Sequence, residues 1–155
     1  MYKTVIWATD GSEASDAALK EALLLTEVTS AHLVALHCDQ RLKGRTGGLP
    51  ALADEDDLRV KIRRQVAELQ SDGVGVELVM RRTHDDAAAA IAAIAKELDA
   101  DVIVCGTRGL DTLAGVVLGS VTQGLLHLAP CPVLAVREPR KPKKKSSVNQ
   151  ASTVA

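Results

Sequence analysis

Aromatic side chains are almost absent from this 155-residue chain, which has one Trp, one Tyr and no Phe. Proteins that bind single-stranded nucleic acid usually stack the bases on aromatic rings, so we expect no nucleic-acid partner. The core must therefore be built from Ala, Val, Leu and Ile, within a hydrophobic content of 46%. A single domain of this length can bury such a core without cross-links.

An excess of charge of either sign is also lacking, since the formal net charge is −1. The chain as a whole therefore lacks the excess positive charge that attracts polyanions. Cys38, Cys105 and Cys131 form no C-x-x-C pair, which favours buried thiols over a disulfide or a metal site. No apolar run approaches the ~20 residues of a membrane span, and no leader precedes the first apolar run. These absences predict a cytoplasmic protein with no membrane partner.

Short apolar runs and helical periods alternate along the chain. The apolar runs predict buried strands, at Val5–Ala8, Leu33–Leu36, Val76–Met80, Asp101–Cys105 and Pro132–Val136. Apolar residues three and four positions apart predict helices between them, at Glu13–Thr29, Asp54–Ser71, from Asp85–Asp86 to Leu98, and from Ser120 to Ala129. This order predicts an α/β fold in which helices sandwich a five-stranded parallel sheet.

Two segments fall outside this alternation. Residues 40–53 carry three glycines and a proline among charged residues, which predicts a loop. After Arg137 the apolar period ends, and residues 139–155 are polar and rich in Lys. We therefore expect one domain over residues 1–138, followed by a disordered basic and polar tail over residues 139–155.

A glycine-rich segment follows the fourth predicted strand: Gly106-Thr107-Arg108-Gly109, nine further residues, and then Gly119-Ser120. Glycine lets backbone N–H groups approach an oxyanion, because no Cβ intervenes. Ser120 begins a predicted helix, where the dipole favours negative charge. Ligands bind beyond the carboxyl ends of parallel strands, where strand order reverses. If the first and fourth strands are neighbours there, Asp10 and this segment share one crevice.

The segment is neither of two common phosphate-binding motifs. The chain contains no Gly-Lys-Ser/Thr, which excludes a Walker A loop, and Asp10-Gly11-Ser12 does not match G-x-G-x-x-G. Nothing in the sequence resembles a water-positioning Gln or Glu with a P-loop Lys. We therefore predict oxyanion binding with slow or no hydrolysis, and no catalytic residue.

The pattern G-x2-G-x9-G-[ST], together with an Asp that ends the first strand, resembles the universal stress protein family. The resemblance covers residues 2–137 and includes residues 2–12, Leu36-His37, the glycine-rich segment through Thr122, and residues 131–136. It implies a flavodoxin-like sandwich related to the adenine nucleotide alpha hydrolases, and members with the full motif bind ATP. It also implies a homodimer formed through strand 132–136.

The resemblance implies a role for each matching residue. Asp10 would contact the ribose or a phosphate-bound Mg²⁺, Ala8 and Thr9 would line the adenine side, and Cys38 would offer backbone groups to the adenine edge. The ribose and phosphates of ATP, AMP or another adenine nucleotide would be held by residues of the glycine-rich motif: Gly106, Arg108, Gly109, Gly119, Ser120, Val121 and Thr122. The turn after the third strand departs from the family, which usually has Gly and often Pro where residues 82–87 are Arg-Thr-His-Asp-Asp-Ala.

Simpler structural explanations also exist for several of these residues. Asp10 can shape an Asx turn or cap the first helix without any ligand. The glycines can serve turns alone, and Arg108 can be a solvated surface charge. His37 and His127 are more typical of structural histidines than of catalytic ones.

Three classes of function remain open. The first is a regulatory, ATP-binding universal stress protein in the stress response that is not primarily an enzyme. The second is a nucleotide-free interaction module of the same fold, which dimerises through strand 132–136 if that strand lies at the sheet edge. The third, an enzyme related to the adenine nucleotide alpha hydrolases, ranks last because no acceptor-substrate site is evident.

Overall fold

The computed structural model describes residues 1–40, 55–84, 86–108 and 118–139. Strands and helices alternate along them, as β1 (Thr4–Ala8), α1 (Glu13–Thr29), β2 (His32–Gln40), α2 (Glu55–Ser71), β3 (Val76–Thr83), α3 (Ala87–Glu97), β4 (Val102–Gly106), α4 (Ser120–Leu128) and β5 (Val133–Val136). The five strands are parallel, in the order β3-β2-β1-β4-β5. The predicted five-stranded α/β fold is confirmed.

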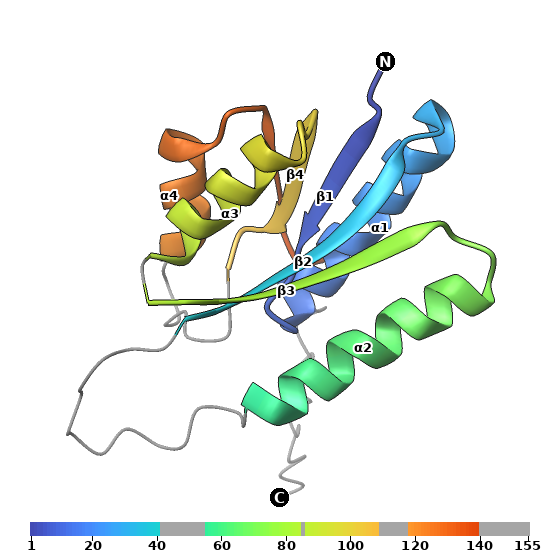
Figure 1. Cartoon of the computed structure of the whole chain (residues 1–155), viewed down its shortest axis with the longest axis horizontal. Coiled ribbons are helices and arrows are strands. Elements are labelled where there is room, and N and C mark those ends of the chain that lie inside the picture. The colour runs from blue at the N-terminus through green and yellow to red at the C-terminus, as the bar shows by residue number, and fades with distance from the viewer. Residues whose placement is uncertain (41–54, 85, 109–117, 140–155) are drawn as a thin grey trace, which may run out of the picture.

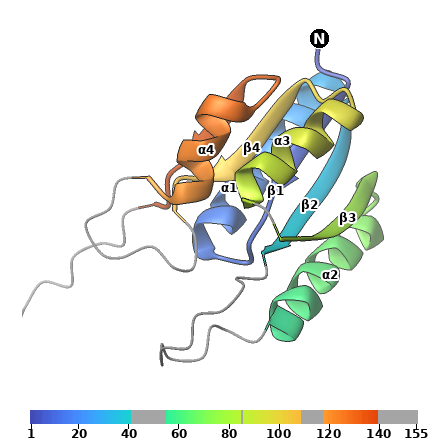
Figure 2. The same ribbon diagram turned by 60° about the vertical axis from the view of Figure 1, so that its left-hand side comes forward.

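The helices cover both faces of the sheet, as Figures 1 and 2 show. Helices α1 and α2 pack over the core that contains Trp7 and Leu33, and α3 and α4 lie side by side over the core that contains Ile6 and Leu36. Both faces of the central strand β1 are therefore buried, which explains its continuous apolar run. Among the described residues, none of the helices has the length and apolar character needed to cross a bilayer.

Strand order reverses between β1 and β4. From β1 the chain adds β2 and then β3 on one side, and it returns to the other side of β1 to add β4 and β5. Ala8 at the end of β1 pairs in register with Cys105 near the end of β4. Asp10 and the glycine-rich segment therefore follow neighbouring strands at the switch point, where sheets of this kind bind ligands.

Strands β2 and β3 are longer than the apolar runs that predict them, Leu33–Leu36 and Val76–Met80. These strands continue to Gln40 and Thr83, because each residue of the extension finds a backbone partner on the other strand. The ladder therefore includes polar residues that an apolar pattern assigns to turns. In Figure 1 this two-stranded extension projects past the ends of β1 and β4.

Asp101 fixes the start of the β1–β4 pairing. Its Oδ2 atom accepts hydrogen bonds from the backbone N–H groups of Lys3 at 2.6 Å and Thr4 at 2.9 Å. Its own N–H donates to the Thr4 carbonyl oxygen at 2.9 Å. The two bonds to the carboxylate favour its ionised form and hold the pKa of Asp101 below its ordinary value.

We expect Asp101→Asn to lower the melting temperature at pH 7. A carboxyl whose pKa is lower in the folded state stabilises the fold above its unfolded pKa of about 3.9, and this contribution is lost as the pH falls through the folded pKa. The difference between wild type and variant in thermal melts should therefore shrink below about pH 4. Asp72→Asn, at an exposed carboxylate elsewhere, is the control, and an Asp101→Asn difference that does not shrink between pH 7 and pH 3 would contradict this account.

Candidate functional site

The turn between β1 and α1 is fixed by side chains of its own residues. Asp10 Oδ1 accepts a hydrogen bond from the Ser12 N–H at 3.0 Å, which closes an Asx turn. The Thr9 hydroxyl accepts from the Gly11 N–H at 3.2 Å and donates to Ser15 Oγ at 3.1 Å. Gly11 has a φ of +78°, a conformation that favours glycine. The structural explanation for Asp10 is therefore present in the fold, and it fixes the carboxylate beyond the end of β1.

Ser12 begins α1 as its N-cap and accepts a hydrogen bond from the Ser15 N–H at 3.2 Å. The Trp7 indole N–H donates to the Ser15 carbonyl oxygen at 2.8 Å. Trp7 is fully buried. The single Trp of the chain therefore attaches the first turn of α1 to β1 and sets where the Asp10 turn lies.

The two halves of the glycine-rich motif meet at the end of β4. The Gly119 N–H donates to the Thr107 carbonyl oxygen at 2.7 Å, and the Thr107 N–H donates to the Val136 carbonyl oxygen at 2.8 Å. The buried Thr122 hydroxyl donates to the Gly106 carbonyl oxygen at 2.8 Å. These bonds attach the start of α4 to the end of β4.

Helix α4 begins without a side-chain cap. Its N-cap is Gly119, which has no side chain that could accept hydrogen bonds from the first helical N–H groups. The N–H groups of residues 120–122 have no partner within an α-helix, and the helix dipole adds partial positive charge there. Ser120 is exposed at this position and adds a hydroxyl donor. The start of α4 can therefore bind an oxyanion.

Gly106 has a packing role that sequence reasoning did not identify. A Cβ at this position would lie 2.7 Å from both the carbonyl carbon and the Cβ of Ala14. Because glycine has no Cβ, α1 can pack directly on the end of β4. The fold itself requires this glycine, whether or not a ligand also approaches the backbone there.

Two of the residues predicted for the adenine side, Ala8 and Cys38, lie on the face of the sheet that α3 and α4 cover, whereas the Thr9 hydroxyl is bonded to Ser15 of α1 on the other face. Ala8 and Cys105 belong to the core on this face, and Cys38 packs against it. Burial raises the pKa of the Cys105 thiol to about 11, a hydrogen bond with Thr122 opposes the shift, and the negative charge of Asp10 adds to it.

Cys38 is half-buried in β2 and pairs in register with Arg81 of β3. Burial raises the pKa of the Cys38 thiol to about 11, although the positive charge of Arg81 opposes the shift. The thiol therefore stays protonated at neutral pH and is not a nucleophile. Any contact of Cys38 with adenine would depend on its backbone groups, as the resemblance implies.

Side chains from β2 and α2 hold the Asp10 turn from the opposite face of the sheet. His37 is buried, with Nδ1 2.8 Å from the Thr9 carbonyl oxygen and Nε2 2.7 Å from Glu55 Oε1. Lys61 Nζ donates to the Gly11 carbonyl oxygen at 2.5 Å. The sequence predicts a structural role for His37 but no role for Glu55 or Lys61. Glu55 lies 18 residues from its partner His37, and Lys61 lies 50 residues from its partner Gly11, so no local pattern indicates these contacts.

We use the term switch-point site for the predicted residues that the structure brings to the carboxyl ends of β1 and β4 and the start of α4. They are Ala8, Thr9, Asp10, Gly106, Gly119, Ser120, Val121 and Thr122. Cys38 lies on the neighbouring strand β2, and Arg108 is exposed beyond β4. Gly109 lies outside the described residues. Within the described ranges no group of three or more His, Cys, Asp or Glu side chains could hold a metal ion.

Two surface grooves in the described part of the chain lie away from this site. One, of about 260 Å³, lies between α3 and α4, and the other, of about 280 Å³, lies between α1 and the end of β5. Neither is lined by a residue of the switch-point site.

Helix α3 begins with an acidic cap, as expected. Asp86 is its N-cap and accepts a hydrogen bond from the Ala88 N–H at 3.2 Å. Asp85 lies outside the described residues.

The doubly wound sheet and the helix start at its switch point define a class of α/β proteins with a ligand site between β1 and β4. Within that class, the sequence profile of the universal stress protein family matches residues 1–137. The chain belongs to the universal stress protein family.

Individual relatives agree with this assignment. A universal stress protein of Thermus aquaticus is 33% identical over 140 residues, which cover 88% of this chain and 100% of the relative. One from Methanocaldococcus jannaschii is 30% identical over 151 residues, which cover 91% of this chain and 85% of the relative. A crystal structure of a universal stress protein in complex with cAMP superposes with a TM-score of 0.66 at 25% identity, over 89% of this chain and 99% of the other.

We expect Gly106→Ala to destabilise the protein by about 1–3 kcal/mol, because the new Cβ would press on the backbone of α1 at Ala14. Urea denaturation measures this change. The matched control is Gly75→Ala, where a Cβ would meet no atom within 4 Å and the change should stay within about 0.5 kcal/mol. Equal stability of the two variants would show that α1 does not pack on β4 as described.

Proposed function

We propose that this protein binds an adenine nucleotide at the switch-point site and acts as a regulatory protein of the stress response. ATP is the expected ligand, and AMP and cyclic nucleotides share the adenine and phosphate groups that the site would recognise. The proposal includes the cytoplasmic location that the sequence predicts.

The observation that carries the proposal is the position of the α4 start. The bond between Gly119 and Thr107 holds this uncapped helix end beside β4, next to the strand that Asp10 follows. A phosphate there would accept hydrogen bonds from the N–H groups of residues 120–122 and from the Ser120 hydroxyl. The ribose would then lie toward Asp10, and the adenine toward Ala8 and the Cys38 backbone.

A solved relative supports an adenine nucleotide as the ligand. The universal stress protein that is 25% identical to this chain was crystallised in complex with cAMP. Both molecules share the fold over nearly the whole of this chain. The ligand of that protein has the adenine, ribose and phosphate groups for which the three parts of the switch-point site are suited.

Binding without efficient turnover is the second part of the proposal. Asp10 would contact a Mg²⁺ ion that is bound to the nucleotide phosphates. Nothing in the sequence resembles a water-positioning Gln or Glu with a P-loop Lys, the groups that hydrolyse nucleotides in P-loop proteins. The nucleotide would therefore act as a regulatory ligand rather than as a substrate.

We expect Ser120→Glu to weaken the binding of AMP, cAMP and ATP by about tenfold or more, because a carboxylate at the helix start repels the phosphate. The same substitution should leave the melting temperature unchanged or raise it, since an acidic residue stabilises a helix N-terminus. Adenosine, which has no phosphate, should bind wild type and variant equally. Isothermal titration calorimetry measures these affinities.

Gln123→Glu is the matched control, because it adds the same charge to an exposed position one turn further along α4. It should reduce nucleotide affinity by less than about threefold. If Ser120→Glu binds AMP as tightly as wild type does, the phosphate is not bound at the start of α4. If wild type binds no adenine nucleotide, the proposed function is wrong.

A nucleotide-free dimeric module remains the second candidate. Strand β5 lies at the sheet edge, and Leu134 on it is 38% exposed. An edge strand of this kind can pair with a second copy of the chain across a two-fold axis. Mass spectrometry of the purified protein separates the candidates: co-purifying nucleotide supports the first function, and a dimer free of nucleotide supports the second.

A further inference from the structure

Asp10 lies between two backbone carbonyl groups that side chains hold from the face opposite the switch-point site. The carbonyl of Thr9 is bonded by the His37 ring, and the carbonyl of Gly11 is bonded by the Lys61 ammonium group. Both contacts lead to α2, because Lys61 belongs to that helix and His37 is bonded to Glu55 in its first turn. The turn that presents Asp10 is therefore held on both sides by one helix.

Both ring nitrogens of His37 have a partner, so the ring fixes the end of β1 relative to the first turn of α2. Nδ1 lies 2.8 Å from the Thr9 carbonyl oxygen, which can only accept a hydrogen bond, so the ring donates from this nitrogen. On the other side of the ring, Nε2 lies 2.7 Å from Glu55 Oε1. The buried ring thus forms a rigid link between the first turn of α2 and the end of β1.

The Lys61 contact is reinforced by packing. A Cβ built on Gly11 would lie 3.0 Å from Leu58 Cδ2 and 4.0 Å from Lys61 Cδ, so α2 lies directly against the turn. Lys61 Nζ also pairs with Asp16 Oδ2 at 3.1 Å. One side chain of α2 therefore connects the Asp10 turn and the first turns of α1.

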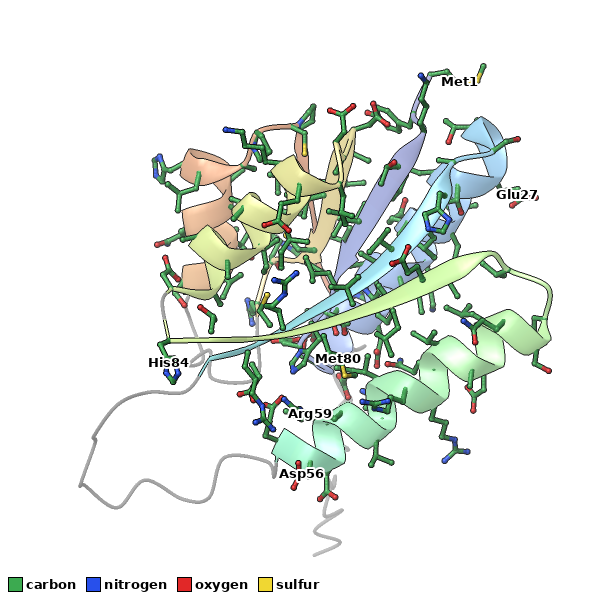
Figure 3. The ribbon with its side chains drawn as sticks, viewed as in Figure 1. Met1, Glu27, Asp56, Arg59, Met80 and His84 are labelled. Atoms are coloured by element: carbon green, nitrogen blue, oxygen red, sulfur yellow. The ribbon has the colours of Figure 1, made fainter. Side chains whose placement is uncertain are left out.

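Helix α2 depends on such polar contacts for its own position. Only Ile62 and Val66 among its 17 residues are buried. Arg59 donates to Asp39 of β2 at 3.0 Å, and in Figure 3 it lies on the sheet side of the helix, whereas Asp56 points away. A helix with so little buried apolar surface is held by its polar partners, and loss of a partner should loosen it.

We propose that α2 is a positioning element for the switch-point site, and that His37, Glu55 and Lys61 are its positioning residues. With these bonds made, the Asp10 turn is held in one conformation; without them, the turn opens locally. Coupling of this kind is reciprocal, so a nucleotide that orders the turn also favours the docked state of α2. The part that concerns nucleotide rests on the proposed function, whereas the part that concerns the turn does not.

Hydrogen–deuterium exchange of the ligand-free protein tests the first part. In Lys61→Met, which keeps the aliphatic stem and removes the donor, amides of residues 9–12 should exchange about threefold to tenfold faster than in wild type. Glu55→Gln should act in the same direction, because it removes the charge that the His37 ring meets. Lys61→Arg restores a donor and should return exchange to within about twofold of wild type.

Two controls separate positioning from general destabilisation. Arg64→Met lies on the same helix, but Arg64 is bonded to Glu68 of α2 itself and both are exposed. Glu77→Gln alters the other His–Glu pair of the sheet, the exposed contact with His32. Neither control should change exchange at residues 9–12. Unchanged exchange in both Lys61→Met and Glu55→Gln, or equal acceleration in Arg64→Met, would overturn the proposal.

A second arm adds cAMP at saturation. In wild type, nucleotide should slow exchange in α2 by about threefold, although α2 lies on the face opposite the site, and in Lys61→Met this protection should be lost. Protection of residues 9–12 and 119–122 without any effect on α2 would contradict the coupling. If no segment is protected in wild type, the proposed function fails, while the ligand-free arm still decides whether α2 positions the turn.

Discussion

The parallel pairing of β1 with β4 is the interaction on which the rest of the structure depends. Asp101 ties the start of β4 to Lys3 and Thr4, and the register carries this alignment forward to Ala8 and Cys105. Both faces of β1 are buried, as expected of the strand at the centre of the sheet. The switch point arises beside it because the chain builds outward from β1 in both directions.

Everything in the switch-point site follows from where these two strands end. Gly106 lets α1 pack on the end of β4, and the hydrogen bond from the Thr122 hydroxyl to the Gly106 carbonyl oxygen attaches α4 to the same strand end. The uncapped start of α4 and the Asp10 turn are thus attached to adjacent strands. The proposed site consists mostly of backbone groups, so the nucleotide binding that we propose would not depend on aromatic side chains, of which the chain has two.

Much of the fold could be predicted from the sequence, because the buried strands are continuous apolar runs and the helices have clear periods. The sequence left open whether the first and fourth strands are neighbours, and the pairing of β1 with β4 shows that they are. The extensions of β2 and β3 could not be predicted, because Asp39 and Arg82 are polar and pair through their backbones. The packing role of Gly106 escaped prediction for a similar reason, since it depends on the distance to a helix almost one hundred residues earlier.

The contacts of α2 with the Asp10 turn could not be predicted from the sequence either. Nothing in the residues around His37 indicates its partner. Glu55 lies 18 residues further along the chain, after a segment for which the sequence predicts only a loop. The sequence predicts residues that would face a nucleotide, but not the side chains that hold the Asp10 turn from the opposite face of the sheet. The contacts of His37, Glu55 and Lys61 define this second set.

The most direct test of the account is a map of backbone amide chemical shifts as cAMP or ATP is added to the labelled protein. The account predicts that the largest changes fall on residues 9–12 at the end of β1 and on residues 119–122 at the start of α4. Changes confined to the groove between α3 and α4, or no changes at millimolar nucleotide, would show that the ends of β1 and β4 do not form a nucleotide site.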